Sequence, residues 1–309
     1  MSELAAREEC TLAGQPLNLI VVDIRPGTVE RMRDDAADRS GTAGPLGWHL
    51  WKTAPADGVR NMAVDAALLR HAGRTGHAVW RFYSWTRPTL SFGRNETTFG
   101  RFDTESVACA GFDAVRRPTG GRALLHSREV TYSVALSIAD DVPWRAAYAS
   151  VNALLERALR SLGIDALITE DAAGAAITPT GPLCFALPSA GEITVGGAKL
   201  VGSAVWRDRG AYLQHGSILL HDDQAHIAGA ALVPTPAPPP AASLANLVSM
   251  AQLPQATGDH AIAALLTSRI EETLGQIGPV TAFIEDASLL ADVARFDAQF
   301  RGPEWLWRR

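Results

Sequence analysis

One cysteine and one lysine have the types and the spacing that could support acyl transfer. Cys184 lies upstream of Lys199, and Lys199 itself lies in a glycine-rich, otherwise apolar passage, GGAKLVGSA. A thiolate is the reactive form of cysteine, and a nearby cation favours it. A positive charge beside a nucleophile also stabilises the oxyanion that develops during acyl transfer. The pair suggests an acyl-cysteine mechanism, although a lysine without a nearby counter-charge is also typical of a side chain that extends its ammonium to water.

A basic glycine-rich turn, RRPTGGR at residues 116–122, is the second candidate site element. Two adjacent glycines let the backbone approach a ligand closely and point N–H groups at it, and the arginines add positive charge. A hairpin turn with solvated arginines is the alternative. The GxxxxGK[ST] spacing of a P-loop is missing. The candidate ligand-binding residues in this turn are Arg117, Thr119, Gly120, Gly121 and Arg122.

Two histidines lie near these motifs, at the starts of expected strands. His126 and His215 are candidate binding residues, and we expect them to shape the backbone by hydrogen bonding rather than to act as bases. The remaining candidates are Gly202, Ser203 and Ala204 after the lysine, and Gly216 after the second histidine. The other cysteines are Cys10, expected to be exposed, and Cys109, expected to be buried. Three widely spaced cysteines without a CxxC indicate neither a disulfide framework nor a metal site.

Alternating helices and strands must position these residues. Helical spacing predicts helices at 61–72, 143–163, 243–250 and 260–274. Runs of β-branched and aromatic residues predict two strands within 78–96, and further strands at 112–115, 123–125, 130–138, 192–195, 199–207 and 211–220. The apolar strands 130–136 and 200–205 are expected to line a pocket for an acyl chain.

Composition limits the classes of partner. The chain has 309 residues, 47% of them hydrophobic, so it can bury a large core. Its net charge of −5 argues against a nucleic-acid partner, whose binding needs clustered Lys and Arg. The N-terminus has no apolar signal region and no apolar run reaches membrane-spanning length, so we expect no membrane association and a cytoplasmic location.

The chain divides into three expected segments. Residues 1–45, with a short strand expected at 17–24, form a variable N-terminal extension that is rich in charged residues, Gly and Ser. Residues 46–230 form the catalytic domain. Residues 231–309 form a proline-rich linker, which includes VPTPAPPPAA, and a helical C-terminal segment.

Taken in order, the motifs resemble those of the biotin/lipoate protein ligase superfamily, within its lipoate-ligase and octanoyltransferase branch. The similar segments are NMAVDAALL, RFYSWTRPTLSFGRNE, RRPTGGRALLH, AKLVGSA and LQHGSILL, and the similarity extends roughly from Gly47 to the C-terminus. Two positions depart from the family pattern, since Ala66 stands where an acidic residue is usual and Asn95 replaces a glutamine. The GRGRxGR signature of biotin ligases is absent.

The resemblance implies an α+β fold, a mixed β-sheet flanked by helices with a small helical C-terminal portion. It places the acyl chain between the TGG loop and the lysine strand. Cys184 followed by Phe185, ahead of the lysine strand, is similar to the Gram-positive type of Cys-dependent octanoyltransferase. Such an enzyme takes octanoate from acyl carrier protein, through an acyl-cysteine, to a lysine of a lipoyl domain of 2-oxoacid dehydrogenases or of the glycine cleavage H protein. It needs no cofactor. In that mechanism Lys199 lowers the pKa of the Cys184 thiol or takes its proton, and it would serve as the base for the acceptor amine if burial depresses its own pKa.

Three alternatives stay open at this point. An ATP-dependent lipoate-protein ligase, with ATP and Mg as cofactors, would use Lys199 to hold an acyl-adenylate, and Cys184 would be incidental. An amidotransferase would use the same cysteine to move octanoyl between lipoyl domains. A non-catalytic binder of lipoyl proteins is the third. The sequence leaves open the donor, the acyl chain, octanoyl versus lipoyl, and the oligomeric state.

Overall fold

The computed structural model describes residues 47–139, 141–169, 183–185, 189–249 and 258–307. The expected N-terminal extension, its short strand and Cys10 lie outside the described residues, as does most of the loop expected to lead to Cys184.

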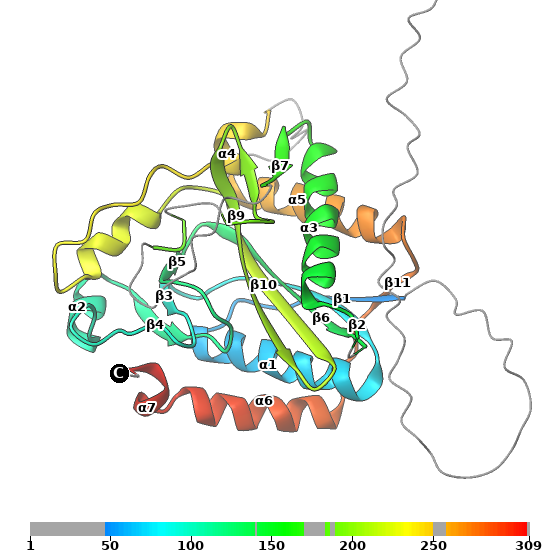
Figure 1. Ribbon diagram of the computed structural model, residues 1–309, viewed down its shortest axis with the longest axis horizontal. Coiled ribbons are helices and arrows are strands. Elements are labelled where there is room, and N and C mark those ends of the chain that lie inside the picture. Colours follow the sequence, from blue (N-terminus) through cyan, green and yellow to red (C-terminus); the bar gives the residue numbers. More distant parts are fainter. Residues whose placement is uncertain (1–46, 140, 170–182, 186–188, 250–257, 308–309) are drawn as a thin grey trace, which may run out of the picture.

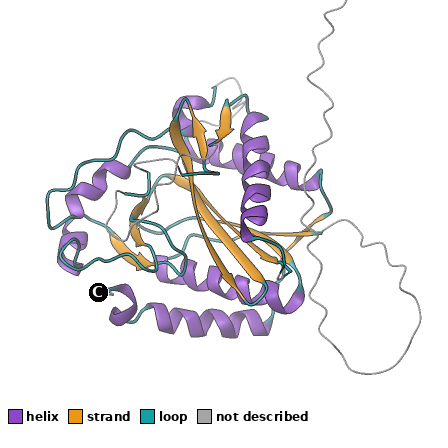
Figure 2. Ribbon diagram, in the orientation of Figure 1, coloured by secondary structure: helices purple, strands orange, loops and turns teal. Residues whose placement is uncertain are grey.

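An eight-stranded mixed sheet forms the centre of the molecule (Figures 1 and 2). Its strand order is β11-β1-β2-β6-β10-β9-β8-β7, parallel from β11 to β2 and antiparallel from there on. The bounds are β1 (Trp48–Lys52), β2 (Ala78–Tyr83), β6 (Glu129–Ser137), β7 (Ala166–Ile168), β8 (Ile193–Val195), β9 (Ala198–Asp208), β10 (Ala211–Leu219) and β11 (Val280–Ala282). A second sheet has the order β4-β3-β5, from β3 (Thr89–Phe92), β4 (Asp113–Arg116) and β5 (Leu124–His126).

Helices cover both faces of the large sheet (Figure 1). One face packs on α1 (Gly58–Thr75) and α6 (Ala287–Phe300), and the other on α3 (Trp144–Arg160) and α5 (Asp259–Gly275). The alternation of side chains along each strand supplies both cores: in β2, Val79 joins the α1 side and Trp80 the α3 side. The short helices are α2 (Thr104–Cys109), η1 (Gln224–Ala230), α4 (Leu244–Leu247) and α7 (Pro303–Leu306).

The predicted fold class, a mixed sheet flanked by helices, is confirmed, and most predicted strands lie within one or two residues of those observed. The helix predicted at 61–72 is longer, because the Asp57 side chain caps it through the backbone N–H of Arg60 and Gly76 ends it with a positive φ. The two strands predicted within 78–96 fall in different sheets. The helix predicted at 243–250 is only the four-residue α4 within the described residues.

Six elements were missed, and one burial was wrong. The strands β1 and β11 and the helices α2, η1, α6 and α7 were not predicted. The C-terminal segment predicted as helical therefore also supplies an edge strand, since β11 pairs with β1. A strand of three residues is too short to show a period of two. Cys109, expected to be buried, is exposed at the end of α2.

One carboxylate joins α1 to three strands of the sheet. Asp65 is fully buried and accepts four hydrogen bonds, from Arg81 on β2 (2.7 Å), Ser133 on β6 (2.8 Å), Tyr83 on β2 (2.9 Å) and His215 on β10 (2.9 Å). Burial raises the pKa of Asp65, but the hydrogen bond from His215 and the charge of Arg81 outweigh it and hold the pKa below its usual value. Asp65 is therefore an ionised carboxylate with every lone pair engaged.

We expect Asp65→Ala to lower the free energy of unfolding by about 3–5 kcal/mol, because it leaves the buried Arg81 guanidinium without its charge partner. The matched control is Glu271→Ala, which breaks the exposed pair with Lys52 and should cost less than about 1 kcal/mol. Urea denaturation measures both variants. Equal losses would show that the buried pair does not hold the fold.

Candidate active site

A narrow pocket opens between α1, the small sheet and the β9–β10 hairpin. The pocket brings together many residues predicted from separate motifs, and adds some that were not. Its lining consists of Met62, Tyr83, Arg117, Leu124, His126, Thr131, Cys184, Gly202, Ser203, Ala204, His215 and Gly216.

Cys184 lines this pocket, and Lys199 contacts Cys184 without itself being one of the lining residues. The ammonium Nζ of Lys199 lies 3.8 Å from Cys184 Sγ and donates to the carbonyl oxygen of Cys184 at 2.7 Å. The backbone N–H of Cys184 donates to the carbonyl of Ala123, which ties the cysteine to the start of β5. The distance places the sulfur within direct electrostatic reach of a positive charge, the arrangement that favours a thiolate.

Lys199 is not without a counter-charge, and the sequence-based interpretation was wrong on this point. Its side chain is only 2% exposed, and Nζ forms an ion pair with Glu192 Oε1 at 2.7 Å. Glu192 in turn accepts from the backbone N–H of Ser189. A buried ammonium needs such a partner. The ion pair excludes the alternative of a lysine that extends to water.

The lysine stem also packs against an aromatic ring. Lys199 Nζ lies 4.9 Å from the centre of the Phe185 ring, a cation–π contact. Gly202 makes room for this arrangement, because a Cβ there would lie 2.9 Å from Phe185 and 3.4 Å from the Lys199 stem. The Cys-Phe pair and the lysine strand therefore form one packed unit in which a larger residue at 202 does not fit.

The arginines of the RRPTGGR turn are buried, not directed at solvent. Arg117 donates to Ser91 (carbonyl and Oγ, both 3.0 Å), to the Gly120 carbonyl (3.0 Å) and to the Arg122 carbonyl (2.8 Å). Arg116 donates to the carbonyls of Gly93 and Glu96, among others. The solvated hairpin is therefore excluded. Arg117 borders the pocket, while its donors hold the loop in shape.

Gly121 and its neighbours complete this loop rather than the wall of the pocket. Gly121 has a φ of +96°, and a Cβ there would lie 2.5 Å from Arg117 Nη2, whereas a Cβ at Gly120 would meet nothing within 4 Å. The pocket lining, within the part of the chain that the structure describes, does not include Thr119, Gly120, Gly121 or Arg122. That these four residues bind a ligand stays a prediction.

His215 connects the loop to the Asp65 carboxylate. Its Nδ1–H donates to Asp65 Oδ2, so that Nε2 accepts from the Thr119 hydroxyl at 2.6 Å. Burial lowers the pKa of His215 although the neighbouring Asp65 carboxylate raises it, and the lowered pKa keeps the ring neutral near pH 7. We expected the histidines to bond to the backbone, and this one bonds to two side chains instead.

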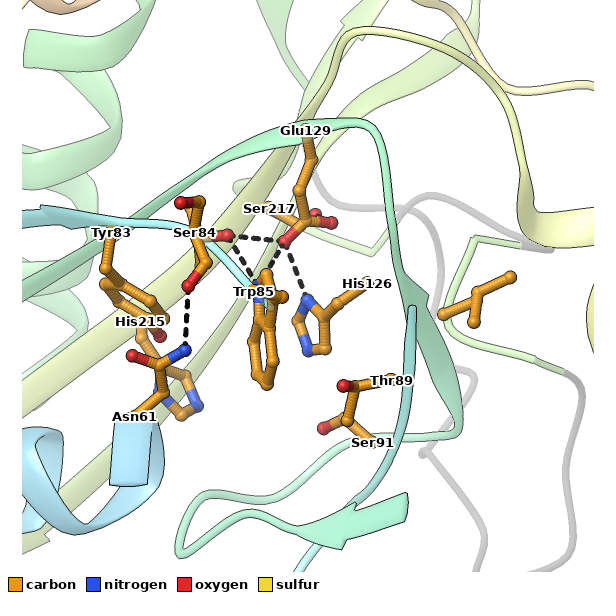
Figure 3. Close-up of polar contacts among 12 residues, drawn as sticks. Asn61, Tyr83, Ser84, Trp85, Thr89, Ser91, His126, Glu129, His215 and Ser217 are labelled. Atoms are coloured by element: carbon orange, nitrogen blue, oxygen red, sulfur yellow. Dashed lines mark hydrogen bonds and ion pairs between the residues drawn. The ribbon is translucent and has the colours of Figure 1, made fainter. Parts of the chain in front are cut away.

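His126 has a buried carboxylate of its own (Figure 3). Its Nδ1 lies 2.7 Å from Glu129 Oε1, and its ring stacks on Trp85 with the ring centres 4.0 Å apart. Glu129 also accepts from Trp85 Nε1 (3.2 Å), from the Thr131 hydroxyl (2.6 Å) and from Ser217 Oγ. The Glu129 carboxylate accepts from all these donors and takes an N–H from Nδ1 as well, while the second ring nitrogen, Nε2, lies on the other side of the ring.

The sequence analysis missed the three carboxylates that hold these groups, Asp65, Glu129 and Glu192. Each was visible as a single acidic residue inside an otherwise apolar or small-residue run: NMAVDAALL, REVTYSVAL and GEITVGG. A lone acid in such a run is rarely buried unless it is paired, and that rule could have identified them.

Among the described residues, no three His, Cys, Asp or Glu side chains gather in a way that could hold a metal ion. None of the described helices is both long and apolar enough to span a membrane.

The fold and this pocket define a class of protein, and comparison with known families agrees. Residues 57–266 match the lipoyl protein ligase A/B catalytic domain family, so the chain belongs to that family. The resemblance found from the motifs is thereby confirmed.

Relatives refine this assignment. The chain is 42% identical over 183 residues to the octanoyltransferase LipM of Kyrpidia tusciae and 42% identical over 179 residues to that of Moorella thermoacetica. These alignments cover 57% and 56% of this chain, and 67% and 65% of those relatives, so the chain matches about two thirds of their length. The relatives that this chain resembles here are therefore proteins named as octanoyltransferases.

Solved structures share the fold. Protein Ta0514 of T. acidophilum, described as a lipoate protein ligase and solved with bound lipoic acid, aligns with a TM-score of 0.66 and 21% identity over 85% of this chain and 100% of that one. A lipoate-protein ligase A bound with ATP aligns with a TM-score of 0.66 and 20% identity, over 85% of this chain and 99% of that one. At these identities the likeness concerns the fold alone.

We expect Gly121→Ala to lower the free energy of unfolding by at least about 1–2 kcal/mol, because an L side chain is strained at this positive φ and collides with Arg117. The control Gly120→Ala enters open space and should change stability by less than about 0.5 kcal/mol. Urea denaturation of the two variants decides the matter. Similar losses would mean that the Arg117 contact does not define the loop.

We expect Lys199→Met to slow alkylation of Cys184 by iodoacetamide about tenfold or more at pH 7. A charge at about 4 Å in an effective dielectric near 20 contributes about 4 kcal/mol of gross attraction, and tenfold needs only about 1.4 kcal/mol of it. Peptide mass mapping after timed alkylation gives the rate at Cys184, and Lys52→Met controls for loss of an exposed lysine. At pH 10, where a thiol ionises without help, the rates should converge. Unchanged rates at pH 7 would show that Lys199 does not promote the thiolate.

Proposed function

We propose that this protein is an octanoyltransferase of protein lipoylation, which moves an octanoyl group through an acyl-Cys184 intermediate to a lysine of a lipoyl domain. The observation that supports it best is the position of Cys184 Sγ, 3.8 Å from the Lys199 ammonium at the edge of the pocket. The relatives named octanoyltransferase support the substrate class.

In the first half-reaction, the Cys184 thiolate attacks the carbonyl of an octanoyl thioester. The new C–S bond forms as the old one breaks, and the leaving thiolate of the donor takes a proton from water. The Lys199 ammonium stabilises the attacking thiolate and lies close to where the oxyanion develops. A backbone N–H of the Gly120–Gly121 loop or of the lysine strand is a further donor to the oxyanion, a role in which one donor contributes about 3 kcal/mol.

The octanoyl chain occupies the pocket next to the sulfur. Met62, Leu124, Tyr83 and Ala204 provide apolar surface there. Burial contributes roughly 0.8 kcal/mol per CH₂, so the chain anchors the acyl group while the cysteine carries it. This agrees in part with the expected lining, since β6 contributes Thr131 and β9 contributes Gly202, Ser203 and Ala204.

The partners follow from the two half-reactions. Acyl carrier protein supplies the thioester, and lipoyl domains of 2-oxoacid dehydrogenases or the glycine cleavage H protein accept the acyl group. A cytoplasmic location, where thiols stay reduced, suits a cysteine that must cycle between thiolate and thioester. The acyl-cysteine route needs neither ATP nor a metal. The proposed division at residues 45 and 230 assigns this chemistry to the middle segment.

We expect Cys184→Ala to abolish transfer to a lipoyl domain while the protein stays folded. Intact mass should show one octanoyl group on the wild-type protein after incubation with octanoyl-acyl carrier protein and no ATP, and none on the variant. Cys109→Ala, at an exposed position away from the pocket, is the control and should acquire the group normally.

Two results would contradict the proposal. A Cys184→Ala variant that octanoylates a lipoyl domain only when octanoate, ATP and Mg are supplied would make the protein a ligase. Acylation of Cys184 by an octanoylated lipoyl domain, but not by the carrier protein, would make it an amidotransferase.

A further inference from the structure

The second half-reaction needs a proton acceptor, and the contacts of Lys199 assign it another task. Its Nζ is paired with Glu192 and donates to the Cys184 carbonyl, both at 2.7 Å, with the sulfur at 3.8 Å. An ammonium has three donors and no acceptor, and these three contacts use all of them. A neutral amine would leave the Glu192 carboxylate buried without its cation, which is strongly unfavourable. Lys199 therefore acts as a fixed positive charge, and a different group must receive the proton.

Two other titratable side chains of the pocket have a ring nitrogen that could accept a proton, His126 and His215. In His215 both nitrogens are engaged, Nδ1 with Asp65 and Nε2 with the Thr119 hydroxyl. In His126 only Nδ1 has a hydrogen-bond partner among the described residues, the carboxylate of Glu129. A proton that Nδ1 donates to Glu129 leaves Nε2 with a lone pair, on a ring that lines the same pocket as Cys184.

We propose that His126 is the general base of the second half-reaction, and that Glu129 is its positioning residue. This inference rests on the proposed function, and concerns only the step from acyl-Cys184 to the acceptor lysine. The neutral ε-amine attacks the thioester carbonyl, a C–N bond forms, and the nitrogen becomes positively charged. His126 Nε2 takes one proton from that nitrogen. The C–S bond then breaks, and its electron pair stays on Cys184 as a thiolate beside the Lys199 ammonium.

The surroundings of His126 suit this role. The imidazolium that forms stands against the Glu129 carboxylate, which is itself held by three further donors, so little rearrangement accompanies the proton transfer. The Trp85 ring stacks on the imidazole with the ring centres 4.0 Å apart, which restricts the plane of the imidazole. Figure 3 shows the two rings side by side. The imidazolium returns its proton to water before the next cycle. The products are an amide, a thiolate and a protonated histidine, which balances the step.

The test separates the two half-reactions. Enzyme octanoylated on Cys184 is isolated and mixed with an unmodified lipoyl domain, and loss of the octanoyl group is followed by intact mass. In His126→Ala the transfer should slow at least about 100-fold, the lower range for a general base. Acylation of Cys184 by octanoyl-acyl carrier protein, which passes no proton to His126, should slow at least tenfold less than transfer does. His221→Ala, a half-exposed histidine paired with Asp259 outside the pocket, is the matched control and should behave as wild type.

Rescue distinguishes a base from a structural side chain. Added imidazoles should restore transfer in His126→Ala, and the restored rate should rise with the basicity of the imidazole used. His126→Gln retains a donor for Glu129 and should fold normally, yet remain slow in transfer. Glu129→Gln should slow transfer and should not respond to imidazole, because the histidine still fills the site.

Several outcomes overturn the inference. If His126→Ala slows acylation of Cys184 and transfer from it equally, the histidine acts in binding the thioester or in positioning the cysteine, and not as the base of the second half-reaction. Wild-type transfer by His126→Gln, or rescue that is independent of imidazole basicity, would make it structural. If Cys184 of the wild-type protein is not acylated without ATP, the proposed function itself is wrong. That result is distinguishable from a failure of the His126 proposal, because no octanoylated enzyme can then be isolated for the transfer experiment.

Discussion

The structure depends on one buried carboxylate that is saturated with donors. Asp65 takes hydrogen bonds from β2, β6 and β10 and carries the charge partner of a fully buried arginine, Arg81. Arg81 in turn donates to Asn61, one turn earlier on α1. An ionised side chain in a core is tolerated only when its charge and its lone pairs are all satisfied. The angle and register of α1 on the sheet are therefore fixed by polar geometry as well as by packing.

The same constraint reaches the pocket. Because Asp65 fixes the tautomer of His215, His215 holds Thr119 and with it the glycine loop. Two further buried carboxylates repeat the pattern, Glu129 on His126 and Glu192 on Lys199. In each pair the acid orients a group that lines the pocket or, for Lys199, contacts the lining residue Cys184. The site thus consists of an outer set of acids, which the fold holds rigidly, and an inner set of cations and imidazoles.

The predictability of the site follows the same division. The cations and imidazoles lie in local motifs with glycines, arginines and histidines at characteristic spacing. These motifs were enough to select Cys184, Lys199, His126 and His215 as candidate site residues from the sequence alone. Asp65 was missed because its partners come from other elements: Asp65 and His215 are 150 residues apart, and no local period reports such a pair. Glu129 and Glu192 lie only three and seven residues from His126 and Lys199, so they were within reach of the rule that a lone acid in an apolar run is buried only when it is paired. The strand β11 was missed for a reason similar to that for Asp65, since only its pairing with β1 makes it a strand.

The two departures from the family pattern leave the polar frame intact. Ala66 replaces an acidic residue but is wholly buried among the apolar residues between α1 and the sheet, and its neighbour Asp65 carries the carboxylate that the frame uses. Asn95 lies outside the residues that line the pocket. A binder without catalytic groups would have no need of a buried ammonium held at 3.8 Å from a thiol.

Lys199 illustrates how position and charge combine. Its contact with the Cys184 carbonyl, at 2.7 Å, is shorter than its contact with the sulfur, so its first effect is to fix where the cysteine lies. Glu192 offsets part of its field, yet the sulfur lies within the distance at which about 4 kcal/mol of gross attraction acts at an effective dielectric near 20. In the proposed mechanism, a lysine that is held charged in this way stabilises a thiolate in both half-reactions, as the attacking group in the first and as the leaving group in the second. Lys199 then leaves the proton of the acceptor amine to another group, which we propose is His126.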